Sequence, residues 1–196
     1  MNVSWRVTTE PTEVINLDIV KLHTRVDVSD EDALAATWPT AARQACEQYT
    51  GRPIGSQVIT AVFDDWFSVA WLPMAAPLIS LDGITYRAAD GTVTTLDTSA
   101  YVVDASNEPA RLAKAPTSVW PSLQPNRLAP ITVTYTAGYT AATLPKPLFQ
   151  GMLLMIEHFN ANRGAVNVGN ITTEIPLGVT ALWAPYQVRW RAPLCE

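Results

Sequence analysis

The sequence predicts an α+β protein in which a small helical bundle carries an inserted β-rich lobe. Apolar residues follow helical spacing near both ends of the chain, and alternating or β-branched residues dominate the stretch between them. Helical and β segments are thus grouped rather than interleaved, which favours segregated layers. We expect a single domain over 1–196 with helical parts at 14–55 and 143–164, the lobe at 56–138 and a C-terminal arm at 165–196.

The N-terminal segment 1–15 is polar and β-prone, and it predicts an extended arm. Asn16 follows it and can cap a short helix over 16–26, because an Asn side chain accepts hydrogen bonds from the free N–H groups of a first helical turn.

A second helix is predicted over 30–50. Ser29 and Asp32 resemble a capping box at its start, and Gly51 suits the residue that ends it. Pro39 lies inside this range and should kink or divide the helix, since proline lacks the N–H that the helix needs. The expected apolar stripe is Leu34, Trp38, Ala41, Ala42, Ala45 and Tyr49.

The lobe is predicted from its β pattern. Residues 57–67 alternate, and two β-branched runs flank Asp90–Gly91, a strong signal for a hairpin. Further strands are expected over 101–103 and 131–135. Residues 104–130 contain several prolines and are expected to form a long loop, which is a common location for function.

A long helix is predicted over 143–164, with Pro145 and Pro147 in its first turn and Gly164 at its end. Its expected apolar face is Leu148, Met152, Met155, Ile156 and Phe159. The remaining residues, 165–196, are expected to form an extended arm.

The content of charged and aromatic residues limits the classes of function that the chain could have. Charged residues make up 16% of the chain, against about 25% in typical proteins, and the chain has seven Trp. Such a composition indicates either a Trp-rich core or an interface, and the sequence does not separate the two. A net charge of −5 disfavours a protein that wraps nucleic acid, which would need basic side chains to neutralise phosphates.

No targeting or membrane segment is recognised. The N-terminus has no apolar signal-peptide core, and the apolar runs are far shorter than the roughly 18 residues that span a bilayer. Cys46 and Cys195 form no CxxC motif, so a reducing compartment is expected. We expect a soluble, intracellular protein without membrane contact.

Catalytic patterns are missing from the sequence. His23 and His158 are not part of an HExxH motif, and neither a GxSxG elbow nor a phosphate-binding P-loop occurs. Asp64 and Asp65 are paired carboxylates beside aromatic residues, but a strand end or turn explains them better than acid–base chemistry. We therefore expect no enzyme activity, no metal and no cofactor.

Four segments of the chain form a recognisable series. They are LDIVKLHTRVDVSDEDALAATWPTAARQACEQYTGRPI (17–54), LPMAAPLISLDGITYRAADGTVTTLDTSAYVVD (72–104), ITVTYTAGYTAATLPKPLFQGMLLMIEHFNANRGA (131–165) and LGVTALWAPYQVRW (177–190). In order and spacing they resemble the head–tail connector proteins of tailed phages, prophages and gene transfer agents. The resemblance covers 14–190. Pro39 departs from the family's unbroken helix, and Gln187 stands where its members usually have Arg.

This resemblance implies a virion structural protein, an adaptor at the head–tail interface of a phage or phage-like particle assembled in the bacterial cytoplasm. Such proteins form an oligomeric ring of about a dozen copies that joins the portal protein to a stopper or tail-terminator protein. DNA passes through the ring lumen during ejection without sequence-specific binding.

The C-terminal arm is the expected portal-binding segment, through Trp183, Tyr186, Arg189, Trp190 and Arg191. Two alternatives remain open. The arm could fold back onto the protein's own helices, as apolar tails often do. The chain could also be a non-catalytic protein–protein interaction module unrelated to virions.

Overall fold

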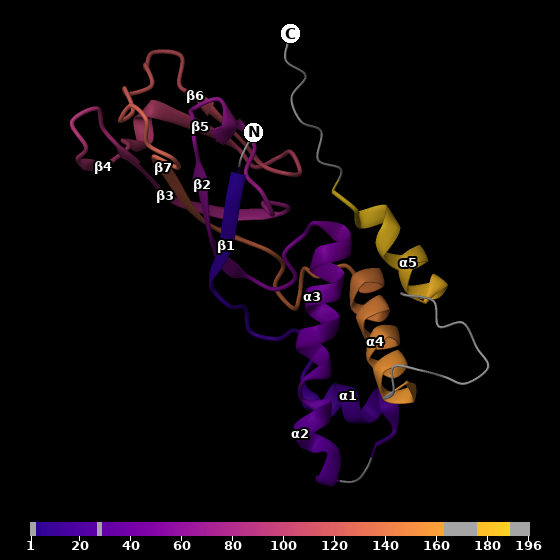
Figure 1. Cartoon of the computed structure of the whole chain (residues 1–196). Helices are drawn as coiled ribbons and strands as arrows, with labels where there is room; N and C mark the ends of the chain where they lie inside the picture. The colour runs from indigo at the N-terminus through magenta and orange to yellow at the C-terminus, as the bar shows by residue number, and fades with distance from the viewer. Residues whose placement is uncertain (1–2, 27–28, 163–175, 189–196) are drawn as a thin grey trace. The chain divides into compact units, whose positions relative to one another are not determined.

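The computed structural model divides the chain into two compact units, and the predicted α+β class is confirmed (Figure 1). The residues that the structure describes are 3–26, 29–162 and 176–188. The β-unit comprises residues 1–11 and 56–139, and the helical unit comprises residues 12–55 and 140–196. The expectation of one domain stays a prediction, and each unit is described by itself.

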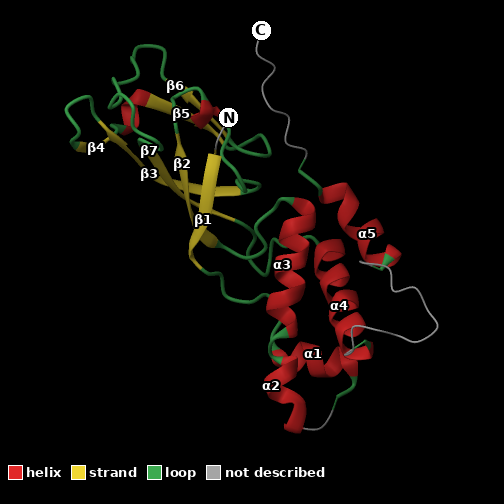
Figure 2. Ribbon diagram, in the orientation of Figure 1, coloured by secondary structure: helices red, strands yellow, loops and turns green. Residues whose placement is uncertain are grey.

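The helical unit is a small bundle in which α1, α3 and α5 all contact α4 (Figure 2). Its α-helices are α1 (Leu17–Thr24), α2 (Asp32–Ala35), α3 (Trp38–Thr50), α4 (Lys146–Ala161) and α5 (Leu177–Trp183). Single 3₁₀ turns, η1 (Ser29–Glu31) and η4 (Ala184–Tyr186), precede α2 and follow α5. The interior is apolar and includes Val20, Ala42, Cys46, Leu148, Met152, Ile156, Val179 and Trp183.

Several helix ends follow the predicted local chemistry. The Oδ1 atom of Asn16 accepts a hydrogen bond from the N–H of Ile19 at 2.9 Å, which confirms the predicted cap of α1. Gly51 ends α3 with a φ of 69°, a left-handed conformation that suits glycine. The long helix predicted over 143–164 is α4, which begins at Lys146 and ends at Ala161. Pro147 lies in its first turn as predicted, Pro145 directly precedes the helix, and Gly164 lies outside the described residues.

Pro39 divides the helix that was predicted over 30–50. α2 ends at Ala35 and α3 begins at Trp38, so Pro39 lies in the first turn of α3, where its missing N–H has no cost. The predicted single helix is therefore wrong, whereas the predicted effect of the proline is confirmed.

Of two finer predictions for this region, one is wrong and the other is right only in part. α2 begins at Asp32 after Glu31, without a side-chain cap, so Ser29 is not the N-cap residue of a capping box. Of the expected apolar stripe, Trp38 and Ala42 are buried as predicted. Ala41 is exposed and Leu34 is 48% exposed, whereas Cys46, which was not in the predicted stripe, is buried.

The β-unit contains an antiparallel five-stranded sheet and a separate strand pair. The sheet order is β1-β2-β7-β3-β4, where β1 is Val3–Thr9, β2 is Gln57–Phe63, β7 is Ile131–Ala137, β3 is Leu78–Arg87 and β4 is Val93–Thr95. The second pair joins β5 (Tyr101–Asp104) to β6 (Arg111–Lys114).

The predicted hairpin is confirmed, because β3 and β4 are joined by the turn that contains Asp90 and Gly91. Two predictions fail here, one for a strand whose partner is far away in sequence and one for a strand whose partner is close. Residues 3–9 are a strand paired with β2 rather than a free extended arm. The predicted loop over 104–130 contains β6, which pairs with β5.

One face of the large sheet forms the core of the β-unit. Burial alternates along β2 and β7, and Ile59, Phe63, Val133 and Tyr135 point inward. The buried hydroxyl of Tyr135 donates a hydrogen bond to the carbonyl of Pro73, and its burial raises the pKa of Tyr135 above the usual tyrosine range. Loop residues such as Val69, Leu72, Ala75 and Ala110 join this core cluster.

Candidate interaction surfaces

The C-terminal helix α5 packs onto the bundle through Trp183. This side chain is fully buried, and its ring centroid lies 5.9 Å from that of Tyr49 in α3. The indole Nε1–H donates a hydrogen bond to the carbonyl oxygen of Leu148 in α4 at 3.4 Å. A Cβ at Gly151 would lie 2.1 Å from the indole Nε1. Gly151 therefore forms a notch in α4 that the indole fills.

The chain after α5 closes the end of α3. The N–H of Val188 donates to the carbonyl of Thr50 at 2.7 Å, and the side-chain amide of Gln187 donates to the carbonyl of Tyr49 at 3.1 Å. Both acceptors belong to the last turn of α3, whose carbonyls lack partners within the helix. Arg52 Nε also donates to the carbonyl of Tyr186 at 2.5 Å. Residues 186–188 are thus held at the C-terminus of α3.

These contacts revise the prediction for the C-terminal arm. An extended conformation is wrong for 177–186, which are helical, and the alternative that the tail folds back onto its own helices holds for the described part, 176–188. Its expected portal-binding residues divide into two groups. Trp183 has no exposed surface and Tyr186 is partly exposed, while Arg189, Trp190 and Arg191 lie outside the described residues. Their docking role stays a prediction.

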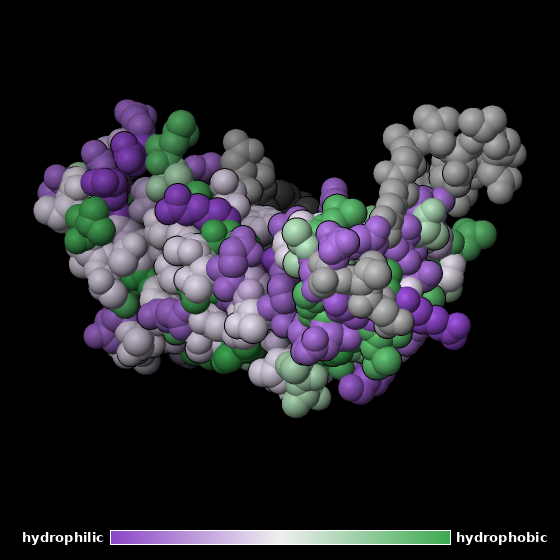
Figure 3. Space-filling view, turned by 90° about the horizontal axis from the view of Figure 1, so that it is seen from below, coloured by the Kyte–Doolittle hydropathy of each residue, from purple (hydrophilic) through white to green (hydrophobic). Residues whose placement is uncertain are grey.

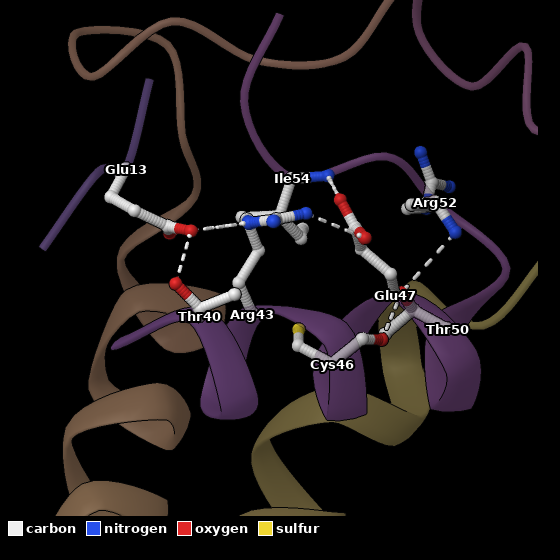
Figure 4. A network of polar contacts seen from close by, with 8 residues as sticks. All are labelled: Glu13, Thr40, Arg43, Cys46, Glu47, Thr50, Arg52 and Ile54. Carbon is white, nitrogen blue, oxygen red and sulfur yellow. Dashed lines mark hydrogen bonds and ion pairs between the residues drawn. The ribbon is translucent and has the colours of Figure 1, made fainter. Parts of the chain in front are cut away.

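A buried guanidinium joins three parts of the helical unit (Figure 4). Arg43 in α3 is 3% exposed, and its Nε lies 3.1 Å from Oε1 of Glu13, which precedes α1. Its Nη1 lies 3.0 Å from Oε2 of Glu47 in the next turn of α3. The other Glu47 oxygen accepts the N–H of Ile54 at 2.8 Å, and Thr40 donates to Glu13 at 2.8 Å.

The two carboxylates stabilise the charge on the buried guanidinium. Burial disfavours the charged form of Arg43, but Glu47 and Glu13 outweigh that effect and raise the pKa of the guanidinium above its ordinary value. Burial also raises the pKa of the neighbouring Cys46 thiol to about 12. An unexposed arginine and a neutral thiol suit a structural clamp rather than proton transfer or nucleophilic chemistry. The clamp fastens the segments before α1 and after α3 to α3 itself.

The paired carboxylates of the β-unit directly follow the end of β2, as their sequence context predicted. Asp64 Oδ1 accepts the N–H of Ala129 at 2.9 Å, and Asp65 Oδ1 accepts the N–H and the hydroxyl of Ser68 at 2.7 and 2.8 Å. His158 lies in α4, where its Nδ1 is 3.2 Å from the side-chain amide of Asn162, and His23 lies in the last turn of α1. In the described part of the chain, no three His, Cys, Asp or Glu side chains gather as a metal site would require.

An aromatic cluster in the β-unit was not predicted from the sequence. The Trp66 and Trp120 rings are stacked with centroids 4.6 Å apart, and Tyr86 meets Trp66 edge-on. Trp66 Nε1 donates to the carbonyl of Pro121 at 2.8 Å, which ties the loop before β7 to the end of β2. The sequence contains no periodic signal for this pairing. The notch at Gly151 was also missed, although an isolated glycine inside an apolar helix usually has a packing reason.

Exposed apolar side chains occur on both units. The helical unit exposes Leu22, Leu34, Leu154 and Leu177, and the β-unit exposes Trp5, Phe67, Ile79, Val93, Val102, Val119 and Leu128. On the face that Figure 3 presents, hydrophobic residues lie as separate patches between polar ones. None of the helices described is long and apolar enough to cross a membrane.

Comparison with solved structures finds the same fold in particle necks. A chain in the neck of an empty gene transfer agent (GTA) particle, computed with C6 symmetry, matches with a TM-score of 0.77 at 19% identity, over 97% of this chain and 98% of that chain. A chain in the virion of a native GTA particle matches with a TM-score of 0.77 at 18% identity, over 96% and 97% of the two chains. A chain in the native GTA neck computed with C12 symmetry matches with a TM-score of 0.69 at 18% identity, over 98% of both chains.

No protein-family model and no curated protein matches this sequence. The similarity to known proteins is therefore a similarity of fold. The structural matches confirm at this level what the four ordered segments of the sequence indicated: the chain shares the fold of chains in GTA necks.

Proposed function

We propose that this chain is an adaptor subunit in the neck of a phage-like particle, where a ring of copies joins the portal protein to the tail. One observation carries the proposal most strongly. The match to a GTA neck chain extends over 97% of this chain and 98% of that chain, so it includes both the β-unit and the helical unit. A match restricted to one common module would support a specific role far less.

The surface of the protein fits assembly with other copies. A closed ring requires two different, complementary patches on every subunit. The low share of charged residues and the exposed leucines of the helical unit, among them Leu22 at 82% and Leu177 at 80% exposure, provide apolar area that such contacts would cover. Two of the similar chains belong to particle necks computed with C6 and C12 symmetry, which is consistent with repeated copies around an axis.

The C-terminal end is the proposed portal contact. The segment that leads into it, residues 183–188, is fixed to the helical bundle, because residues 186–188 bind the end of α3 and Trp183 fills the notch at Gly151. Arg189, Trp190 and Arg191 follow directly and carry the aromatic and guanidinium groups that dominate many interfaces. In this proposal Trp183 holds residues 183–188 on the bundle, while the residues after Val188 contact the portal protein.

The test is to mix the purified protein with the portal protein from the same genome and to image the mixture by negative-stain electron microscopy. Rings attached to the portal are expected. A stable monomer that ignores the portal would contradict the proposal and would favour an interaction module unrelated to virions.

A truncation separates the two parts of the proposal. Removing residues 189–196 leaves the contacts of Gln187 and Val188 with α3 intact. This variant should keep its fold and any ring, but it should lose portal binding. Removing residues 185–196 would be less informative, because that change also uncaps α3. Unchanged portal binding by the shorter truncation would show that the C-terminal residues are not the docking segment.

A further inference from the structure

The five-stranded sheet of the β-unit ends in two edges that have no strand partner among the described residues. β1 pairs with β2 on one side, and β4 pairs with β3 on one side. Natural proteins usually protect such edges with proline, lysine, inward charges or very short strands. β1 has seven residues, VSWRVTT, with no proline and no lysine, and its one irregularity in register lies between Val7 and Thr9, so the regular part over residues 3–7 is open to pairing with another strand.

Trp5 indicates that β1 is incompletely covered. It is the cross-strand partner of Ala61 and shares the inward face of the sheet with Ile59 and Phe63. Those two β2 side chains are fully buried, whereas Trp5 is 44% exposed. A strand added outside β1 would bring side chains alongside the indole and extend the core over its exposed flank.

The opposite edge differs in length and charge. β4 has three residues, all exposed, and Val93 is 62% exposed. The only charged residues between 88 and 99 are Asp90 and Asp97, which flank β4. Hydrogen bonds from Thr92 and Ser99 lower the pKa of these carboxyls, so both are anionic at neutral pH. The single charge within β1 is Arg6, which is opposite in sign to these two aspartates, and Glu10 directly follows the strand.

Strand direction determines how two copies would meet. Five strands that are all antiparallel to their neighbours leave the two outer strands pointing the same way. Copies related by a small rotation about a distant axis keep that direction. Such copies would therefore pair β4 of one with β1 of the next as parallel strands, in a head-to-tail contact of the kind that closes rings.

We propose that β4 of one copy pairs with β1 of the neighbouring copy, so that the sheets of adjacent subunits join edge to edge. The inference rests on the proposed ring and identifies one of its interfaces. Arg6 and Thr95 both lie on the sheet face away from the core. A register that places them side by side puts Asp97, two residues further along, at about 7 Å along the strand from Arg6, within reach of its side chain.

Disulfide trapping tests the contact. In a Cys195→Ser background, where the remaining Cys46 is buried, one population carries Arg6→Cys and another carries Thr95→Cys. Adjacent strands bring Cα atoms close enough for a disulfide. After mixing and mild oxidation, covalent dimers of the two species are expected. The control population carries Arg127→Cys in place of Arg6→Cys, because Arg127 is also exposed in the β-unit. With this control, the yield of covalent dimers should be at least fivefold lower.

The outcomes separate this inference from the proposed function. Rings in the electron microscope without the mixed cross-link would overturn edge pairing and leave the adaptor proposal intact. Cross-linking of Arg6→Cys with itself would instead show a symmetric β1–β1 contact, which also overturns the inference. A protein that neither assembles nor cross-links at high concentration contradicts both.

A charge reversal provides a second, independent measurement. Arg6→Glu would place like charges at the joined edges and should raise the concentration needed for half-assembly about fivefold, an effect that added salt weakens. Arg127→Glu makes the same change in charge at an exposed residue outside β1 and β4 and should leave that concentration unchanged. Equal effects of the two variants would show that net charge, not edge pairing, governs assembly.

Discussion

Gly151→Ala provides a sharp test of how α5 is held. In an ordinary exposed helix position this change stabilises a protein by about 1 kcal/mol, because alanine favours the helix more than glycine. Here the new methyl group would lie 2.1 Å from Nε1 of Trp183 and 2.8 Å from its Cδ1, far inside contact distance. The indole must leave the notch, and losing a buried tryptophan costs about 3–5 kcal/mol. The net loss should be about 2–4 kcal/mol after the propensity gain is subtracted.

The assay is urea unfolding followed by circular dichroism, which reports the helices, together with hydrogen exchange of residues 177–186. Gly178→Ala is the matched control, because a Cβ there meets no atom within 4 Å. That variant should be as stable as the parent or up to about 1 kcal/mol more stable. In a Trp183→Ala background the Gly151→Ala change should turn from destabilising to stabilising. If Gly151→Ala alone stabilises the protein, the notch does not hold the indole.

Further variants address the buried network, the core and DNA. Arg43→Met removes the buried guanidinium that pairs with Glu13 and Glu47 and should cost about 3–5 kcal/mol in urea unfolding, whereas a loss below about 1 kcal/mol would refute the clamp. Cys46 keeps its proton in the folded state up to about pH 12, while the unfolded thiol ionises from about pH 8.5. The unfolded state therefore binds fewer protons in that window, and stability should fall by about 1.4 kcal/mol per pH unit. Cys46→Ala should remove this contribution to the pH dependence of the free energy of unfolding. An unchanged pH dependence in that variant would refute the contribution of the thiol. Tyr135→Phe should cost about 1–3 kcal/mol by leaving the carbonyl of Pro73 unpaired, and equal stability would show that the hydrogen bond is dispensable. With a net charge of −5, the isolated protein should not retard DNA in a gel at physiological salt; tight, salt-sensitive binding would contradict an inert lumen.

Local chemistry made parts of the fold predictable. The cap at Asn16, the break at Pro39, the stop at Gly51 and the hairpin at Asp90–Gly91 each depend on residues within one turn of the feature. Strand β1 was missed because its partner β2 begins far along the chain, and a strand is identified by its neighbour as much as by its own residues.

The C-terminal region shows why the candidate surface was harder to predict. A helix as short as α5, with seven residues, has little stability of its own. Its formation depends on Trp183 and on the glycine notch in α4, a contact between residues distant in sequence. Aromatic residues grouped near a chain end are typical of a docking arm, but the same residues can anchor that end to the protein itself. Burial, which the sequence does not contain, separates the two roles.

The tryptophans can now be assigned one by one, which refines the choice between a Trp-rich core and an interface. Trp183 and Trp38 are buried in the helical unit, and Trp66 and Trp120 stack on each other in the β-unit. Trp71 is partly buried, and the guanidinium carbon of Arg111 lies 5.6 Å from the centroid of its ring. These five tryptophans contact other parts of the protein itself and give no evidence for a partner. Of the tryptophans that the structure describes, Trp5 stands apart at 44% exposure, on a strand whose outer edge is unpaired. Because a half-exposed tryptophan on an open edge gains most from added cover, the interface interpretation now depends on β1 rather than on aromatic content in general.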